Sequence, residues 1–133
     1  MPVPSYLTFD PIVPGPAFFD DGQGAEVQFL GTVRGEEGGQ PISGIEYSAY
    51  EPMAAKVLAD LIERGQREHA TPHAAEVRHR LGFVANREPS LLIRIRSRHS
   101  AAAFDLCRWY LHEIKTTVPI WKRPVFLSDS PPP

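Results

Sequence analysis

The sequence is poor in cysteine and contains no long apolar run. Cys107 is the one cysteine among 133 residues, so no disulfide forms within the chain and nothing demands an oxidising compartment. No apolar stretch approaches the roughly 20 residues that a membrane-spanning helix needs. The start, Met1 to Pro4, lacks the basic and apolar regions of a secretory signal. We therefore expect a cytoplasmic protein with no membrane partner.

An excess of either charge is also missing. The chain has 14 basic and 16 acidic residues, a net charge of −2, which gives no global case for binding nucleic acid or a membrane surface. The charges are unevenly spread, because residues 1–63 include ten acidic and two basic side chains, and residues 64–133 six acidic and twelve basic ones. The basic half either holds an anion or pairs with the acidic half, within one chain or across a dimer. Composition alone leaves both interpretations open.

Several standard enzyme motifs are absent. The sequence contains no GxGxxG, GxxxxGK[ST], GxSxG or HExxH. His69 and His73 are four residues apart, but Pro72 breaks the helix that would align them, so we interpret both as surface histidines and expect no metal site. Cys107 falls on an apolar stripe in the middle of a predicted helix, where a thiol is typically a core residue.

Alternating apolar residues predict four strands, over 26–34, 42–50, 75–81 and 90–98. The first two strands resemble a hairpin, with 35–41 as a mobile loop at its tip. On the last strand, side chains alternate between an apolar inner face and a basic outer face, formed respectively by Leu91, Ile93, Ile95 and by Arg94, Arg96, Arg98.

Two longer segments have helical periodicity. The first helix begins near Pro52, whose missing N–H costs nothing in a first helical turn, and ends before Pro72. The second covers about 100–117, with Ser100 as its predicted N-cap, and an extended piece follows over 120–123. The predicted buried stripe of this second helix comprises Phe104, Cys107, Leu111, Ile114 and Val118.

This order of elements predicts one domain. We find neither an internal repeat nor a linker, so residues 1–133 are expected to form a single α+β domain. Within it, 1–24 is predicted to be irregular and 127–133 a disordered tail. A chain of this length buries enough surface for a genuine core.

The segment 115–122, KTTVPIWK, contains two of the three lysines in the chain. Taken singly, Lys115 complements the helix macrodipole and Lys122 is an ordinary solvated side chain. Together, on either side of a rigid proline and beside a large apolar tryptophan, they can converge on one pocket. A lysine that is partly desolvated or close to another cation loses its proton more easily and becomes a base or nucleophile. The residues alone leave both interpretations open.

This segment resembles the signature of the large, catalytic subunit of molybdopterin synthases, the MoaE family. Four further segments are similar to blocks of that family and follow in its order: 31–34 (GTVR), 45–54 (IEYSAYEPMA), 77–82 (VRHRLG) and 97–104 (SRHSAAAF). The resemblance covers about 24–123, and five ordered blocks are far more specific than any one of them.

The resemblance implies a fold, partners and a reaction. The family adopts an α/β hammerhead-like fold with two main helices and an added antiparallel β subdomain, and it forms a homodimer within a heterotetramer. Each large subunit binds a small ubiquitin-like subunit whose C-terminal Gly-Gly carries a thiocarboxylate. Its sulfur is transferred to cyclic pyranopterin monophosphate, and two rounds form the molybdopterin dithiolene. No metal or other cofactor is implied at this step.

The resemblance also implies residue roles. Lys115 and Lys122 match the two functional lysines, and Arg34 and His99 match substrate-binding residues. Arg123 is a further candidate for binding substrate. Two lysines and an arginine supply countercharge to a phosphate and a thiocarboxylate without a metal. The sequence departs from the family where its His-Arg pair reads His99-Ser100, which removes one cation.

Two other functions remain open at this point. The chain is either the enzyme or a non-catalytic homologue that still binds a ubiquitin-like partner. A nucleic-acid binder that uses the basic face of 90–98 is a third reading, but no aromatic residues interleave with those arginines as stacking platforms. That face is more simply explained by solvation or by a dimer interface, so we expect no nucleic-acid partner.

Overall fold

The computed structural model describes residues 6–16 and 19–127, and this part of the chain contains two helices and eight strands. In chain order they are β1 (Leu7–Thr8), β2 (Ala25–Thr32), β3 (Glu36–Glu37), β4 (Gln40–Ala49), α1 (Glu51–Glu68), β5 (His73–Arg80), β6 (Gly82–Ala85), β7 (Pro89–Ser97), α2 (Ser100–Thr117) and β8 (Ile120–Phe126). Apart from Leu127, the predicted disordered tail lies outside the described residues. The expected α+β class with two main helices is confirmed.

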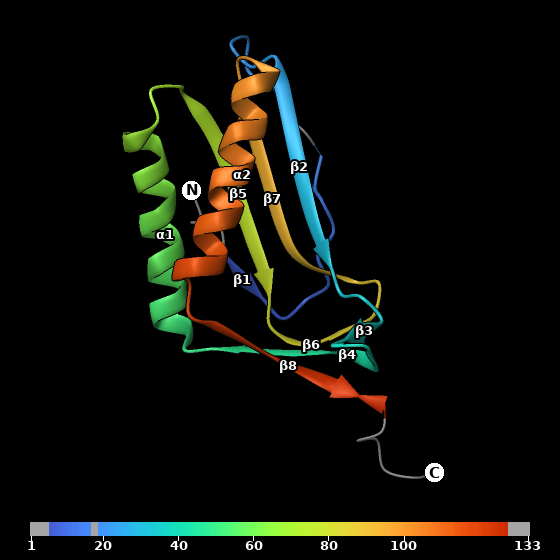
Figure 1. Ribbon diagram of the computed structural model, residues 1–133. Helices are drawn as coiled ribbons and strands as arrows, with labels where there is room; N and C mark the ends of the chain where they lie inside the picture. The colour runs from blue at the N-terminus through green and yellow to red at the C-terminus, as the bar shows by residue number, and fades with distance from the viewer. Residues whose placement is uncertain (1–5, 17–18, 128–133) are drawn as a thin grey trace.

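The larger sheet has the strand order β1-β5-β7-β2, and both helices cover one of its faces (Figure 1). The central strand β7 pairs antiparallel with β5 and β2, and β1 pairs parallel with β5. Ile93 and Ile95 of β7 are fully buried among residues of both helices, as the alternation predicts. The sheet and the two helices therefore enclose the main core.

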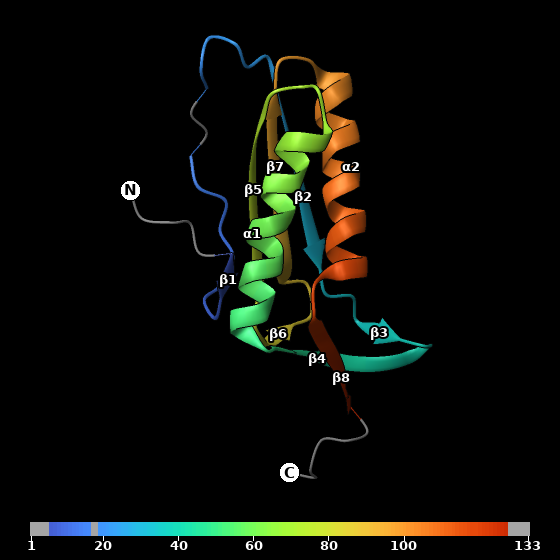
Figure 2. The same cartoon turned by 90° about the vertical axis from the view of Figure 1, so that its left-hand side faces the viewer.

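The outer face of β7 is not simply solvated, which was one of the two explanations that the sequence left open. Leu92 is 0% exposed and Arg94 only 4%. The described residues that precede β2, over 9–16 and 19–24, run along this face of the sheet, opposite the helices (Figure 2). Arg94 Nη2 donates a hydrogen bond of 2.8 Å to the carbonyl oxygen of Gly15. The basic face is therefore partly covered by the chain itself.

Helix α2 begins and ends where the sequence predicts, but its buried stripe is rotated. Phe104 is 60% exposed, because Ala103 occupies the inward position at the start of the helix and a step of one residue turns about 100° away from the core. Ser100 is not the N-cap. That position belongs to His99, which is extended and makes no side-chain capping bond. The inward residues of α2 are Ala103, Leu106, Cys107, Tyr110 and Ile114.

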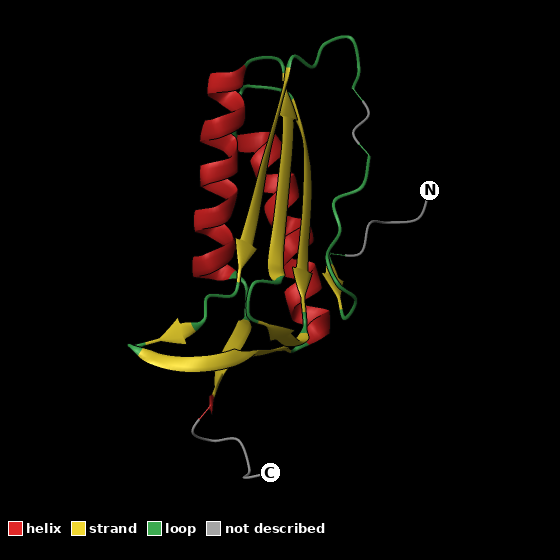
Figure 3. Cartoon of the chain, turned by 90° about the vertical axis from the view of Figure 1, so that its right-hand side faces the viewer, coloured by secondary structure: helices red, strands yellow, loops and turns green. Residues whose placement is uncertain are grey.

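The predicted hairpin between 26–34 and 42–50 is wrong. β2 pairs with β7 of the larger sheet, whereas β4 pairs with β6 and β8 in a separate antiparallel sheet that lies across the lower end of the molecule (Figure 3). The expected loop over 35–41 contains β3, which pairs with the start of β4 through a turn at Gly38 and Gly39, both with positive φ. This smaller sheet corresponds to the added antiparallel subdomain.

Candidate active site

A pocket of about 580 Å³ lies where the smaller sheet meets the end of α2 and the end of β2. Apolar side chains of β2, β7, α2 and β8 form part of its lining, among them Phe29, Leu91, Ile114 and Ile120. The polar side chains that line it are Thr32, Arg34, Tyr47, His79, Ser90, Lys115 and Lys122. The site is therefore assembled from both sheets and one helix, and none of these elements forms it alone.

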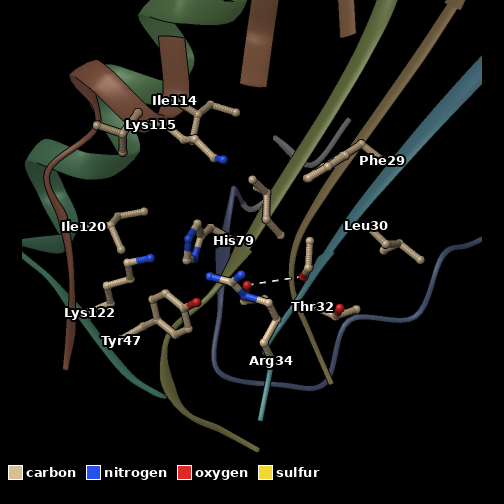
Figure 4. Close-up of a pocket in the computed structure, with 14 residues that line it drawn as sticks. Phe29, Leu30, Thr32, Arg34, Tyr47, His79, Ile114, Lys115, Ile120 and Lys122 are labelled. Atoms are coloured by element: carbon tan, nitrogen blue, oxygen red, sulfur yellow. Dashed lines mark hydrogen bonds between the residues drawn. The ribbon is translucent and has the colours of Figure 1, made fainter. Parts of the chain in front are cut away.

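The two lysines of the KTTVPIWK segment line the same pocket. Lys115 lies in the last turn of α2, and Lys122 lies on β8, paired in register with Tyr47 of β4. Between them the chain leaves the helix at Val118, the C-cap residue, whose N–H still donates to the carbonyl of Ile114. Figure 4 shows both ammonium groups directed into the pocket from different elements. The short connection between α2 and β8 thus places two lysines around one cavity.

Arg34 adds a third positive charge. It follows directly after β2, is exposed, and extends its guanidinium into the pocket (Figure 4). Among the described residues, no aspartate or glutamate lines the pocket, and no carboxylate lies in an ion pair with Arg34, Lys115 or Lys122. The pocket is therefore electropositive and its three cations are available to an anionic ligand.

His79 is a pocket residue to which the sequence analysis gave no role. It lies near the end of β5 and is 8% exposed. Its Nδ1 is 2.8 Å from the carbonyl oxygen of Arg80, and its ring meets the ring of Tyr47 edge-on, with centroids 5.1 Å apart. Burial lowers the pKa of His79 from its ordinary value of 6.5, and the hydrogen bond to Arg80 opposes this effect only in part. The sequence does contain a sign of its importance, because His79 is the histidine of the 77–82 segment that resembles a block of the family.

Two predicted substrate-binding residues do not line this pocket. His99 precedes α2, whereas Lys115 lies in its last turn, and a helical rise of about 1.5 Å per residue over this span places them about 24 Å apart. Arg123 is next to Lys122 on β8, where successive side chains point to opposite faces of the strand. Both residues are exposed. A single chain therefore brings together Arg34, Lys115 and Lys122, but neither His99 nor Arg123.

The other residues considered from the sequence have structural surroundings. His69 and His73 are not free surface side chains, because their rings contact Trp109 and Tyr110 respectively. Cys107 is buried, and burial raises the pKa of its thiol. Within 6–16 and 19–127, no group of three or more His, Cys, Asp or Glu side chains is arranged to hold a metal ion. In the same part of the chain, no helix is long and apolar enough to cross a membrane.

Comparison with known proteins relates these features to a family. The sequence model of the family described as "MoaE protein" matches residues 8–117. A molybdopterin synthase catalytic subunit of Thermoplasma volcanium is 41% identical over 102 residues, which cover 77% of this chain and 74% of that protein. The Arabidopsis thaliana protein of the same name is 38% identical over 79% of this chain, but the chain spans only 52% of its length. The crystal structure of molybdopterin synthase from Staphylococcus aureus matches with a TM-score of 0.82 and 28% identity, over 91% of this chain and 90% of that one.

Proposed function

The chain belongs to the MoaE protein family, whose pattern matches residues 8–117, and on this premise we propose that it is the catalytic subunit of a molybdopterin synthase. It transfers sulfur from the C-terminal thiocarboxylate of a small ubiquitin-like subunit to cyclic pyranopterin monophosphate. The product is the dithiolene of molybdopterin, so the protein acts in molybdenum cofactor biosynthesis. The names of its relatives in Thermoplasma volcanium and Arabidopsis thaliana support this function.

The observation that carries the proposal is the convergence of Arg34, Lys115 and Lys122 on one pocket without a carboxylate among its described lining residues. Both reactants are anions, since the pterin carries a phosphate and the sulfur donor a thiocarboxylate. Three cations in a partly apolar cavity neutralise such a pair more effectively than they would in bulk water. The geometry therefore fits a reaction between two anionic groups that repel each other in solution.

The three cations have different tasks in this reaction. The planar guanidinium of Arg34 offers parallel N–H donors that match two phosphate oxygens. Lys115 and Lys122 reach the cavity from α2 and β8, so they bind the thiocarboxylate and stabilise the negative charge that develops on a substrate oxygen as the carbon–sulfur bond forms. We assign Lys115 and Lys122 as catalytic residues and Arg34 as a substrate-binding residue.

The proposed enzyme is an assembly. The relatives are named catalytic subunits, which implies a second kind of subunit, and we assign this role to the small ubiquitin-like sulfur carrier. We propose a homodimer of this chain with one small subunit bound to each copy, in the cytoplasm, and a single domain over residues 1–133. His99 and Arg123 remain candidates for substrate binding in that assembly, where another chain would have to bring them to a pocket.

The test mixes the purified protein with a thiocarboxylated small subunit and cyclic pyranopterin monophosphate, and measures molybdopterin. Lys115→Ala is expected to reduce the rate by roughly 100-fold or more, because a positioned charge next to the reacting atoms is lost. The free energy of unfolding should fall by less than about 1 kcal/mol, since Lys115 is exposed and loses only a macrodipole contact. Thermal unfolding of the same preparation measures this.

The matched control is Lys56→Ala, which removes the third lysine of the chain from an exposed position on α1, outside the pocket. It should leave the rate unchanged. Normal turnover by Lys115→Ala, or an equal loss in Lys56→Ala, would contradict the assignment of Lys115. A wild-type protein that binds the small subunit but forms no product would identify the chain as a non-catalytic homologue.

A further inference from the structure

His79 is the buried titratable side chain among the described residues of the pocket, while the three cations around it are exposed. Figure 4 shows its ring in the middle of the cavity, with Lys122 and Tyr47 on one side and Arg34 on the other. A histidine in this place needs a physical account, because burying an imidazole beside cations is unfavourable for its charged form.

One hydrogen bond determines which ring nitrogen of His79 carries a proton. Nδ1 lies 2.8 Å from the carbonyl oxygen of Arg80, and a carbonyl oxygen can only accept, so Nδ1 is the donor. In a neutral ring Nε2 is then a free acceptor. Among the described residues, none forms a hydrogen bond with Nε2, and the edge-on contact with Tyr47 limits rotation of the ring. The structure thus holds one proton acceptor in a fixed orientation.

Burial keeps this acceptor free. It disfavours a second proton on the imidazole and lowers the pKa of His79 from 6.5. Lys115 from α2, Lys122 from β8 and Arg34 after β2 line the same cavity, together with the phenol of Tyr47 from β4, and no carboxylate among the described lining residues offers the ring a countercharge. His79 is therefore neutral at neutral pH, in contrast to the three cations.

Sulfur transfer requires a proton acceptor at one defined step. When the thiocarboxylate sulfur bonds to a pterin carbon, a bond from that carbon to oxygen breaks and its electron pair goes to the oxygen. The sulfur is still bonded to the acyl carbon of the small subunit, so a thioester joins the two molecules. Water must cleave it: the water oxygen bonds to the acyl carbon, and the acyl–sulfur bond breaks with its electron pair on sulfur. The products are a carboxylate and a pterin thiolate, and both protons of the water are released. No oxidation or reduction is involved.

We propose that Nε2 of His79 takes the first of these protons, as the general base for the water that cleaves the thioester between small subunit and pterin. This role rests on the proposed function and adds a residue to it. The cations hold the anionic ends of the thioester adduct, and His79 activates the water. Because general-base catalysis contributes roughly 100- to 10,000-fold, loss of Nε2 should slow this step by a similar factor while the adduct still forms.

His79→Asn separates this role from a structural one. The amide nitrogen of asparagine occupies nearly the position of Nδ1 and can donate to the Arg80 carbonyl, but nothing replaces Nε2. Single-turnover reactions with the thiocarboxylated small subunit and the cyclic pterin are followed by mass spectrometry of the intact small subunit. The variant should accumulate the covalent small subunit–pterin adduct and release product slowly. His112→Asn, an exposed histidine on α2 outside the pocket, is the matched control and should show no accumulation.

Each outcome decides the proposal. Normal turnover by His79→Asn shows that the Arg80 hydrogen bond is the whole role of this side chain and overturns the proposal, as does loss of product without any adduct. If the variant does not fold, the pH dependence of adduct cleavage by the wild-type protein decides. The rate should fall at acidic pH as His79 gains a proton, with a midpoint below its ordinary pKa of 6.5, and a rate that stays constant until the protein itself unfolds in acid overturns the proposal. If the wild-type protein forms neither adduct nor product, this result contradicts the proposed function itself.

Discussion

Arg94 shows how a single residue can depart from the pattern of its strand. Alternation on β7 directs it away from the helices, yet it is 4% exposed because the segment before β2 covers it. Its guanidinium lies 3.6 Å from a carboxylate oxygen of Glu26 and 3.5 Å from one of Glu76. Its hydrogen bond to Gly15 spans 79 positions, so no local periodicity could have predicted it. Because two carboxylates and a carbonyl hold this buried cation, Arg94 has a structural role.

Arg94→Met is therefore expected to lower the free energy of unfolding by about 1–3 kcal/mol. The substitution keeps the apolar stem but leaves the Gly15 carbonyl without its partner and removes one of the two arginines paired with Glu76, which keeps Arg78 at 3.8 Å. Glu26 retains Arg96 at 2.8 Å, which limits the loss. Denaturant unfolding measures the difference. Arg98→Met, an exposed arginine just beyond the same strand, should change stability by less than about 0.5 kcal/mol, and equal effects of the two substitutions would contradict this account.

The raised pKa of Tyr110 predicts how the stability of the protein depends on pH in the alkaline range. Burial raises the pKa of Tyr110 from 10 to about 12, and its hydroxyl lies 2.7 Å from Nε2 of His73. Between these pH values the unfolded chain loses the phenolic proton and the folded chain keeps it. Stability is therefore complete below pH 10 and falls as the pH rises towards 12, by about 2–3 kcal/mol in total.

The measurement compares unfolding of the wild-type protein and of Tyr110→Phe between pH 9 and about 12. All other titrating groups are common to the two proteins, so the difference in slope reports Tyr110. At pH 9 the free energy of unfolding of Tyr110→Phe should be lower than that of the wild-type protein by about 1–3 kcal/mol, because His73 loses a hydrogen-bond partner. Parallel curves for the two proteins would show that the Tyr110 hydroxyl titrates normally.

Among the candidate site residues, those that could be predicted carry their signal in local sequence. Lys115 and Lys122 were recognisable from one short segment around a proline, and Arg34 from the resemblance of the 31–34 block to its family. His79 belongs to the 77–82 block that resembles the family, but a histidine in a strand has no distinctive spacing of its own, and its importance depends on a cavity built by other elements. Composition and periodicity describe single residues and single elements, whereas the site depends on which distant segments pack together in the fold.

At the scale of elements, the sequence predicted the ends of α2 and the inner face of β7, although the buried stripe of α2 is rotated from the predicted one. Strand pairing was not predictable in the same way. β2 and β4 are consecutive long strands, but they form their backbone hydrogen bonds in different sheets. The sheet that each strand joins depends on β7 and β8, which lie far along the chain. The four-residue strand β6 is too short for its alternation to be recognised.

Gly65 lies at the contact between the two helices. It is buried in α1, and a Cβ at this position would overlap the hydroxyl and ring of Tyr110 on α2. Gly65→Ala would gain up to about 1 kcal/mol of helix propensity, but we expect a net loss of about 1–3 kcal/mol because the contact between helices is overpacked.

Thermal unfolding checks this expectation. Glu63→Ala, at an exposed position of the same helix, is the control, and it should change stability by less than about 0.5 kcal/mol. A Gly65→Ala variant more stable than the wild-type protein would show that α1 can move away from α2 without loss.

At the scale of the whole molecule, the proposed enzyme requires partners. Light scattering of the protein alone at micromolar concentration should show a dimer, and addition of the small subunit should yield a complex with two small subunits per dimer. The reason is that each chain has one described pocket with the three convergent cations, which takes one C-terminal tail. A monomer at this concentration, or a stoichiometry of one small subunit per dimer, would contradict the proposed assembly.

The two sheets also differ in how much core supports them, and this has a consequence for the lifetime of the site. Among the described residues, the core of the smaller sheet consists of four buried side chains, those of Val33, Ile42, Ile45 and Val84. The larger sheet and its two helices, which together form the larger layer, enclose a core of thirteen. Lys122 belongs to the smaller sheet and Lys115 to the larger layer. Amide hydrogens of β4, β6 and β8 should exchange with solvent before those of β7, through openings short of global unfolding. Each such opening separates the lysines while most of the protein remains folded, so catalytic competence should disappear on heating before the loss of helical structure.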